Sequence, residues 1–395
     1  MKIFSILILL NLIIHSRLCG QTEYSFYSFS DDISTEIARD TVPWKYQLGA
    51  AKYSFIGNHT MALSAWDLAM KVRNYQPSAL DSVLLKNFTP QNAVDHIIHR
   101  SAKEQIIILN EAHHNAQHRT FTRSLLKGLY QNGYRYLGLE AISDSAINER
   151  NFAILKSGYY TKEPEFGNLI SEAKKLGMVI FGYEASEGKN GKEREIEQAK
   201  NIQLFMKSNP PGKYIIHCGF DHVYENAVQN WEKAMAGRLK EYSGIDPFTI
   251  DQVRFSEKSK SEYSHLFLYA TNEQTPFVFL DQANNVFNGI SMPKQTDIMV
   301  IHPITKYIQG RPNWLSMDKV EYRIPDTRLL IKEYPIQVLA FREDEYEQNG
   351  IPADIIEINS SKNIKPLYLK EGSYTILIRN KEYNIIHRYT VSVIK

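Results

Sequence analysis

The sequence predicts an α/β fold: a mainly parallel sheet flanked by helices, with an N-terminal helical segment and a small C-terminal antiparallel β-domain. Between residues 101 and 315, short apolar runs rich in β-branched and aromatic residues alternate with polar amphipathic stretches of helix length. Most of these runs are continuously apolar, as is typical of strands covered on both faces. After residue 315 the helical periodicity ends, and apolar and polar residues alternate as in half-buried antiparallel strands.

The composition limits the possible functions. The chain has 395 residues, of which 43% are hydrophobic and 23% charged, so it can bury at least one large core, and disorder, collagen and coiled coil are excluded. The 46 basic and 44 acidic residues give a net charge of +2 without long runs of one sign. This balance argues against a dedicated nucleic-acid binder. We therefore expect a small-molecule substrate and no nucleic-acid partner.

Residues 1–20 have the pattern of a secretory signal peptide, with cleavage expected just before Gln21. Its apolar core is too short to span a bilayer, and no later stretch reaches 18 consecutive apolar residues. We expect an exported protein, periplasmic or extracellular. A lipoprotein anchor at Cys19 is disfavoured because residues 16–18 do not fit the small-residue pattern. After cleavage Cys218 is the single cysteine, so an intramolecular disulfide is impossible.

Residues 21–100 are expected to form a helical lid or brace. The spacing of Tyr46, Tyr53 and Trp66 matches a single tetratricopeptide-like helix pair. One pair cannot bury both of its faces, so we expect it to pack on the next domain rather than to form a peptide-binding solenoid.

Residues 101–315 are expected to form the catalytic or binding domain. The expected strands are residues 105–109, 134–139, 178–183, 213–216, 248–251, 265–269, 277–280 and 297–301. The expected helices are residues 116–130, 165–176, 191–207 and 223–242. Strands that alternate with helices predict right-handed crossovers and a mainly parallel sheet.

Residues 316–395 are expected to form a small antiparallel sandwich. Its expected strands are residues 321–324, 336–341, 355–358, 374–378 and 388–393. The segment holds no cluster of catalytic residue types. We therefore expect a packing or attachment role and a domain that can be deleted without loss of the chemistry, the alternative being that it caps the cleft.

Ionisable residues follow four successive strands of the expected sheet. Ligands of such sheets bind outside the carboxyl ends of the strands. The candidate catalytic residues at these ends are Glu111, His113, His114, Glu140, Glu184 and His222. The sequence therefore predicts one site at this edge of the sheet.

Carboxylates beside imidazoles support two kinds of chemistry. A histidine can act as general base toward water while a glutamate orients its ring. The same residue types can bind a divalent metal, in which case the expected ligands are Glu111, His113, Glu184 and His222.

Three further residues are candidates for substrate binding: His118, Arg119 and His217. His118 and His114 stand four apart at the start of a helix and could share one face. Arg119 and Arg123 could hold an anionic group of the substrate, although a solvated helix face is the leading expectation for them. His217 could equally be a core histidine.

Cys218 is not expected to be a nucleophile, and His302 is a weaker extra candidate.

Four short segments carry a resemblance to a known superfamily. They are Leu109-Asn110-Glu111-Ala112-His113-His114, Leu139-Glu140, Tyr183-Glu184 and Gly219-Phe220-Asp221-His222-Val223. The order of these segments and their placement at strand ends resemble the erythromycin esterase, ChaN and Tiki superfamily. The resemblance covers residues 104–305. The resemblance implies an α/β fold with the site at one sheet edge. Branches of the superfamily include macrolide esterases that activate water with a histidine, haem-binding lipoproteins and metal-dependent proteases.

The first segment fits two branches of that superfamily. Glu111 and His113 match the Glu-x-His spacing of the haem-binding branch, and Glu111 and His114 match the Glu-x-x-His spacing of the esterase branch. Asn110 replaces the glycine that usually precedes the glutamate. The leading hypothesis is a secreted hydrolase of the esterase type, with His114 or His113 as base and no required cofactor. The alternatives are a metal-dependent hydrolase or protease and a non-enzymatic binder of haem or another small ligand.

Overall fold

The computed structural model of the protein describes residues 26–269, 271–290, 293–325 and 333–394. The expected signal peptide lies outside these residues. Among the helices that are described, none combines the length and the apolar composition needed to cross a membrane.

A six-stranded parallel sheet forms the centre of the α/β part and confirms the predicted fold class. Its strands lie in the order β10-β8-β2-β5-β3-β4. Their bounds are β2 Ile106–Glu111, β3 Tyr134–Leu139, β4 Val179–Gly182, β5 Lys213–Gly219, β8 Phe248–Asp251 and β10 Ile298–Met299. The described helices of this part are α6 Ala93–Ser101, α7 Ala116–Gln131, α8 Ile147–Arg150, α9 Pro164–Lys175, α10 Gly191–Ser208 and α11 Met235–Ser243.

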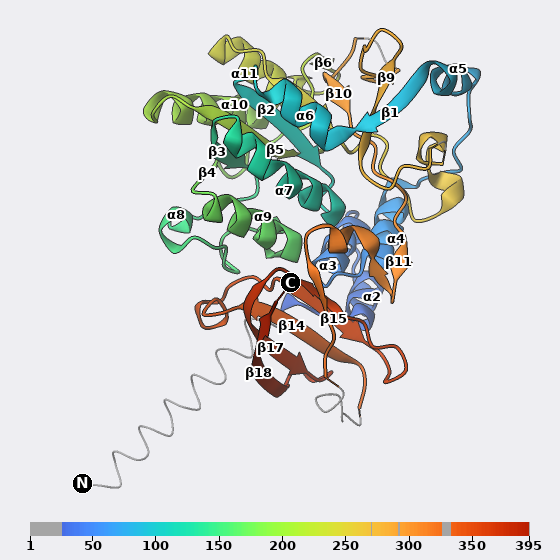
Figure 1. Cartoon of the computed structure of the whole chain (residues 1–395), viewed down its shortest axis with the longest axis vertical. Coiled ribbons are helices and arrows are strands. Elements are labelled where there is room, and N and C mark those ends of the chain that lie inside the picture. Colours follow the sequence, from blue (N-terminus) through green and yellow to red (C-terminus); the bar gives the residue numbers. More distant parts are fainter. Residues whose placement is uncertain (1–25, 270, 291–292, 326–332, 395) are drawn as a thin grey trace.

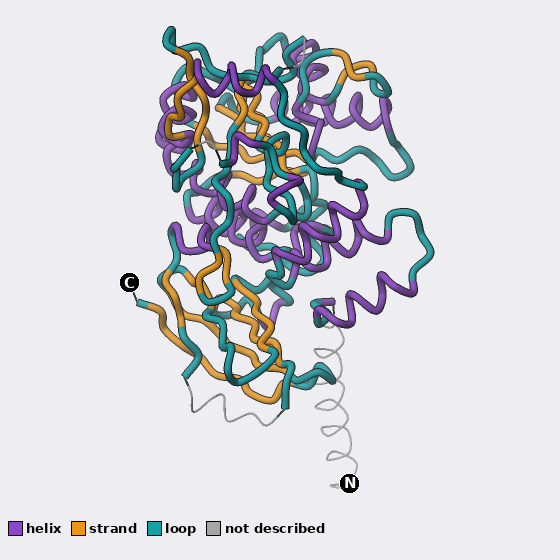
Figure 2. Tube along the Cα trace, turned by 90° about the vertical axis from the view of Figure 1, so that its right-hand side faces the viewer, coloured by secondary structure: helices purple, strands orange, loops and turns teal. Residues whose placement is uncertain are grey.

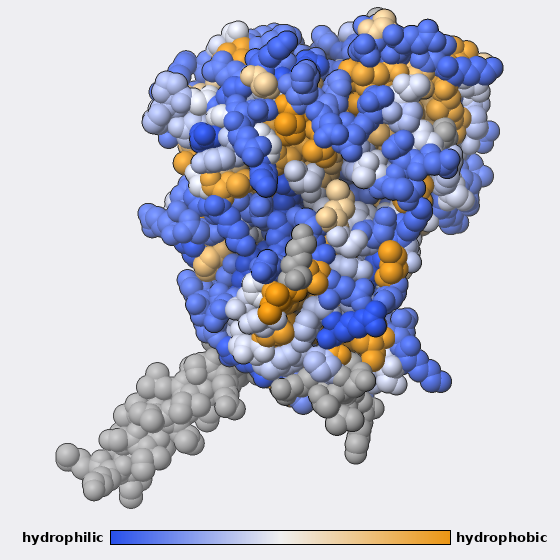
Figure 3. All heavy atoms as spheres, in the orientation of Figure 1, coloured by the Kyte–Doolittle hydropathy of each residue, from blue (hydrophilic) through white to orange (hydrophobic). Residues whose placement is uncertain are grey.

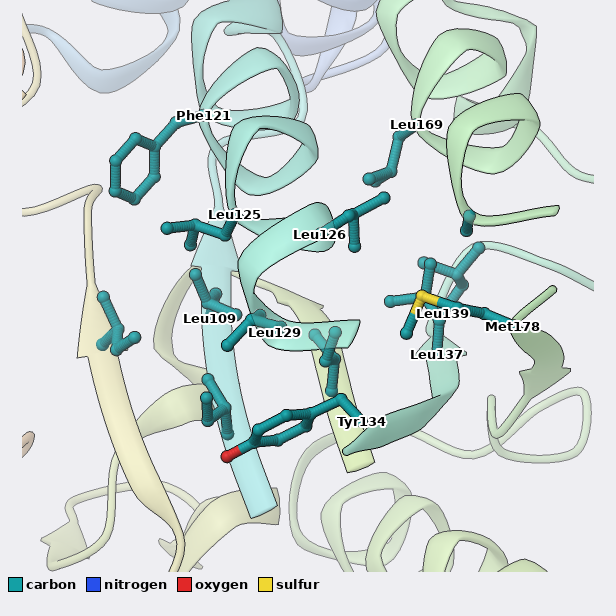
Figure 4. Packing of buried hydrophobic residues seen from close by; sticks show 14 of the residues in the cluster. Leu109, Phe121, Leu125, Leu126, Leu129, Tyr134, Leu137, Leu139, Leu169 and Met178 are labelled. Carbon is teal, nitrogen blue, oxygen red and sulfur yellow. The ribbon is translucent and has the colours of Figure 1, made fainter. Parts of the chain in front are cut away.

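Helices cover both faces of this sheet, which explains the continuous apolar strands. In β2, Ile107 and Leu109 pack in a core with α6, α7 and α9, whereas Ile106 and Ile108 pack with α10 and α11. Successive side chains of a strand point to opposite faces, so both sets must be apolar. Figure 4 shows the first of these cores, where leucines of α7 such as Leu125 and Leu129 lie against the strands.

The C-terminal part is a second, antiparallel sheet at the other end of the molecule (Figure 1). Its strands are β15 Asp354–Ile358, β14 Ile336–Arg342, β17 Gly372–Arg379 and β18 Ile385–Val393, in that order. Beside it, β13 Val320–Tyr322 pairs with β16 Leu367–Leu369. Antiparallel strands in this region were predicted, but β16 was not.

Three N-terminal helices share a core with this second sheet. They are α2 Ser30–Arg39, α3 Lys45–Phe55 and α4 His59–Met70, whereas α5 Ala79–Asn87 packs in a separate cluster with β9 Phe277–Asp281. Tyr53 and Phe55 of α3 pack in one buried cluster with Leu339 of β14 and Leu377 of β17. Figure 2 shows helices lying between the two groups of strands. The helical segment thus joins the C-terminal sheet as well as facing the α/β part.

Three expected elements differ from the structure. Residues 265–269 are not a strand but contain the 3₁₀ turn Leu266–Leu268. The expected helix 223–242 begins at Met235, after the short hairpin of β6 Ala227–Val228 and β7 Glu232–Lys233. The strand β9 Phe277–Asp281 forms, but it pairs antiparallel with β1 Phe88–Asn92 outside the parallel sheet. Apolar content alone does not distinguish a strand from another buried segment.

The surface in the view of Figure 1 is mainly hydrophilic, with apolar residues gathered in separate patches (Figure 3). Apolar residues are thus not gathered into one continuous surface on this face.

Candidate functional site

Glu111 is the last residue of β2, and its side chain is only 2% exposed. Arg119, on the second turn of α7, donates from Nε to Oε2 over 2.6 Å and from Nη2 to Oε1 over 2.7 Å. Burial alone would raise the pKa of Glu111, but Arg119 and two histidines bring it well below its ordinary value. Glu111 is therefore an ionised carboxylate inside the protein.

Two histidines contact this carboxylate from opposite sides. His113 Nδ1 lies 2.9 Å from Oε1, and His217 Nε2 lies 2.9 Å from Oε2. An ionised carboxylate can only accept hydrogen bonds, so Nδ1 of His113 carries the proton of that contact. In the tautomer with its one proton on Nδ1, the ring presents a lone pair at Nε2, which has no hydrogen-bond partner among the described residues.

The ring of His113 is fixed by its neighbours as well as by Glu111. Tyr160 stacks on it with centroids 3.8 Å apart, and Phe220 meets it edge-on at 5.1 Å. Its Nε2 edge faces Gly219, because a Cβ at that glycine would lie 2.6 Å from Nε2 and 3.4 Å from Oε2 of Glu140. His113 thus extends from Glu111 toward the end of the neighbouring strand, and its side chain is 16% exposed.

Glu140, directly after β3, forms the second carboxylate of the site. Its Oε2 accepts the backbone N–H of Gly219 over 2.6 Å, and its Oε1 accepts from Arg194 Nη2 over 2.5 Å. Burial favours the neutral acid, but His222, His113, Arg194 and the Gly219 N–H outweigh it and lower the pKa of Glu140 to about 2.

Arg194, near the start of α10, joins three strand ends. Besides Glu140, it binds Glu184 through two donors, over 3.0 Å from Nε and 2.6 Å from Nη2. Its Nη1 lies 3.0 Å from His222 Nε2. The side chains of Arg194 and Glu184 are 29% and 38% exposed, so this group forms the open side of the site.

His222 lies in a 3₁₀ turn, Phe220–Val223, that follows β5. Its Nδ1 lies 2.7 Å from Glu195 Oε1, and its ring stacks on Trp231 at 5.3 Å. Burial alone would lower the pKa of His222, but Glu140 and Glu195 raise it above its ordinary value. Both ring nitrogens are engaged, Nδ1 by Glu195 and Nε2 by an arginine that can only donate, so His222 is not a free base in this arrangement.

His114 is separated from Glu111, although it is adjacent to His113 in sequence. Its ring stacks on Trp66 of α4 at 4.3 Å, and its buried Nδ1 has no hydrogen-bond partner in the described structure. Burial lowers the pKa of His114 well below its ordinary value. Of the two spacings considered, Glu111 and His113 are the pair in contact.

The three residues expected to bind substrate are all buried in the described structure. His118 accepts the backbone N–H of Ala112 at Nδ1 and contacts Ser256 at Nε2, each over 3.0 Å. Arg119 is fully buried and binds Glu111, so a solvated helix face does not describe it. His217 is buried between Glu111 and Thr122, which fits the alternative of a core histidine. Contact of these residues with a substrate stays a prediction.

A buried ion-pair network continues from Arg119 toward the C-terminal part. Arg119 Nη1 donates to Glu163 over 3.1 Å. On the next turn of α7, Arg123 donates to Glu165 over 3.1 Å, and Lys319 binds the same carboxylate. The solvated face expected for Arg123 is therefore also wrong.

The turn after β5 is strained. Phe220 has φ = +36°, an unusual value for a residue with a side chain. Asn110 fixes this turn, since its Nδ2 donates to the Phe220 carbonyl over 2.8 Å and to Asp251 Oδ1 over 2.9 Å. Asn110 thus ties the ends of three neighbouring strands together.

The candidate metal ligands do not converge on one point. Among the described residues, no group of three or more His, Cys, Asp or Glu side chains is placed to hold an ion. Glu111 and Glu184 are each bound by an arginine through two donors. The donor set as arranged here does not fit a metal site.

Aromatic residues surround the His113 ring and the loop beside it. The ring of His113 is covered by Tyr160, and Tyr159 packs edge-on against Phe55 and Tyr160.

Several residues of the site were not anticipated from the sequence. Arg194 and Glu195 lie on α10, a helix that was expected only to cover the sheet. Trp66 and Tyr160 reach the site from segments far away in the chain. The sequence did offer a signal for Arg194 and Glu195, because they belong to a Glu-Arg-Glu triplet at residues 193–195, at the start of the helix that follows Glu184.

The sequence matches no protein-family model and no curated protein. Three solved structures show the range of similarity. The type III effector HopBA1 matches 55% of this chain and 97% of its own at 10% identity and a TM-score of 0.35. RRSP, a MARTX toxin effector domain from Vibrio vulnificus, matches 65% of this chain and 48% of its own at 15% identity and a TM-score of 0.31. ChaN of Campylobacter jejuni, whose structure shows cofacial heme binding, matches 55% of this chain and 98% of its own at 12% identity and a TM-score of 0.28. The chain is thus structurally similar to these proteins at a coarse level, which does not establish a shared function.

Proposed function

We propose that the protein is a hydrolase in which His113 activates water for attack on an ester or related bond of a small-molecule substrate. The observation that carries the proposal is the contact between His113 Nδ1 and ionised Glu111, which leaves Nε2 as a lone-pair acceptor. Nε2 takes a proton from water as the water oxygen attacks the substrate carbonyl carbon. Glu111 holds the ring and stabilises the imidazolium that forms. The proton then passes from Nε2 to the leaving oxygen.

The surrounding groups support this assignment. Arg119 and His217 keep Glu111 ionised and immobile, and Tyr160 with Phe220 fixes the ring plane of His113. The resemblance to the erythromycin esterase, ChaN and Tiki superfamily suggests the same class of chemistry. Here His113 takes the role, although its spacing from Glu111 is that of the haem-binding branch.

The proposal is tested by replacing the two adjacent histidines separately. On a panel of ester and lactone substrates, His113→Asn should lower kcat by about 10²–10⁴-fold, the usual contribution of a general base. The matched control, His114→Asn, should lose much less, because His114 does not contact Glu111. A His113→Asn protein that folds and keeps its rate would contradict the proposal.

A further inference from the structure

A cavity lies at the carboxyl end of β8 and β10, beside the site. Its volume is about 570 Å³, within the usual range for small-ligand pockets. Its walls come from the loop between α4 and α5 with the start of α5, the turn after β5, the segment that follows β8, and residues between β9 and β10 with Met299 of β10. Ser256 in this wall contacts His118, which packs behind Glu111, so the cavity adjoins the site without including it.

Two cations line this cavity without an ion-pair partner among the described residues. Arg254 is exposed, and Lys258 is half-buried. The Lys258 ammonium is poorly solvated, and burial lowers its pKa below the ordinary value. The electrostatic attraction between such a cation and an anionic ligand is stronger than that of a fully solvated cation.

The acidic residue in the lining is already occupied. Asp81 is 1% exposed, and its Oδ2 accepts from Tyr75 Oη over 2.5 Å, from the Ser78 N–H over 2.7 Å and from Ser78 Oγ over 2.8 Å. These donors are neutral and come from its own wall, so its oxygen is occupied although its charge remains. Two cations against one carboxylate still leave the lining with an excess of positive charge.

Aromatic rings complete the lining, at Tyr75, Tyr224, Phe255 and Tyr263. Burial raises the pKa of Tyr224, so the phenol stays uncharged, and its hydroxyl already donates to Asp221. Rings beside cations suit a ligand with a planar apolar body and one negative group.

We propose that this cavity is a binding site for a small organic anion with a planar apolar body. Arg254 and Lys258 pair with its carboxylate or equivalent group, and the aromatic walls hold its body. The binding is independent of the reaction proposed at His113, and it can be measured without turnover.

The test compares two probes of equal size on the mature protein by calorimetric titration: 1-naphthoate and neutral 1-naphthalenemethanol. We expect naphthoate to bind at least tenfold more tightly than the alcohol. The double variant Arg254→Gln/Lys258→Gln should weaken naphthoate binding at least tenfold and leave binding of the alcohol unchanged. Both replaced side chains lack hydrogen-bond partners in the described structure, so the fold should persist, which thermal unfolding checks.

The matched control is Arg39→Gln/Lys207→Gln, which removes the same net charge from exposed side chains outside the cavity. It should leave naphthoate affinity unchanged. The proposal is overturned if the alcohol binds as tightly as naphthoate, if the control weakens binding as much as the cavity variant, or if naphthoate does not bind at millimolar concentration.

Discussion

Glu111 holds the site together, because one carboxylate binds a buried arginine and two histidines. Its removal leaves the Arg119 guanidinium in the interior with a deficit of negative charge. Breaking a buried ion pair from one side generally costs about 3–5 kcal/mol. The same change frees the ring of His113.

Glu111→Gln should therefore lower the free energy of unfolding by about 3 kcal/mol or more and abolish hydrolysis. Urea unfolding and initial rates measure the two effects. Glu172→Gln breaks a partly exposed pair with Lys370 and should cost less than about 1 kcal/mol. Equal costs for the two variants would mean that the Glu111 network does not stabilise the fold.

Glu163 should give the stability a pH dependence near neutrality. Burial raises its pKa from 4.5 to about 7, against the opposing effect of Arg119. An acid whose pKa is higher in the folded chain stabilises the fold at low pH, and this contribution is lost as the pH rises from 4.5 through about 7.

In urea unfolding at about pH 5 and pH 8, Glu163→Gln should lose less stability than the wild type between the two conditions, because Gln does not ionise. The amide oxygen can still accept the Phe166 N–H at the start of α9. If the free energy of unfolding changed equally between the two pH values in the variant and the wild type, Glu163 would ionise normally in the folded protein.

At the scale of elements, the end of β5 sets the space available to His113. Gly219 has φ = −83° and ψ = 147°, which any residue can adopt, so its role here is steric. A Cβ would lie 2.5 Å from His113 Cε1, too close for the ring to stay in place.

Gly219→Ala should therefore reduce hydrolysis at least tenfold while the fold persists, as measured by initial rates and circular dichroism. Gly244→Ala is the control, because it introduces backbone strain at φ = +71° with nothing within 4 Å of the new Cβ. It should lower stability by about 1 kcal/mol and leave the rate unchanged. The steric interpretation fails if Gly219→Ala retains full activity.

At the scale of the whole molecule, the C-terminal sheet is part of the folding unit of the N-terminal helices. Its strands β14, β15 and β17 complete the core around α3. Lys319 and Asp318 also bind the buried Glu165 and Arg123. The expectation that residues 316–395 can be deleted conflicts with this shared core.

A chain ending at Leu315 should expose the apolar faces of α2 and α3 and leave Glu165 with one fewer cation. We expect it to be insoluble or to unfold at a much lower temperature than the full chain, as measured by thermal unfolding. A truncated protein with an unchanged Tm and full activity would restore the original expectation.

The sequence alone determined the α/β class and most strands of the central sheet, because strands buried on both faces leave continuous apolar runs. It also placed Glu111, Glu140 and Glu184 at strand ends, since parallel strands end at one edge. Tertiary structure decided that His113 rather than His114 contacts Glu111, because the direction of a side chain depends on partners such as Tyr160 and Trp66.

Tertiary structure also decided which charges are exposed. Arg119 and Arg194 both lie on helices that border the sheet, yet one is fully buried and the other partly open. No local pattern separates them, because burial depends on what packs across the helix. Likewise, the core that joins Phe55 to Leu377 unites residues more than three hundred positions apart, and only folding brings them together.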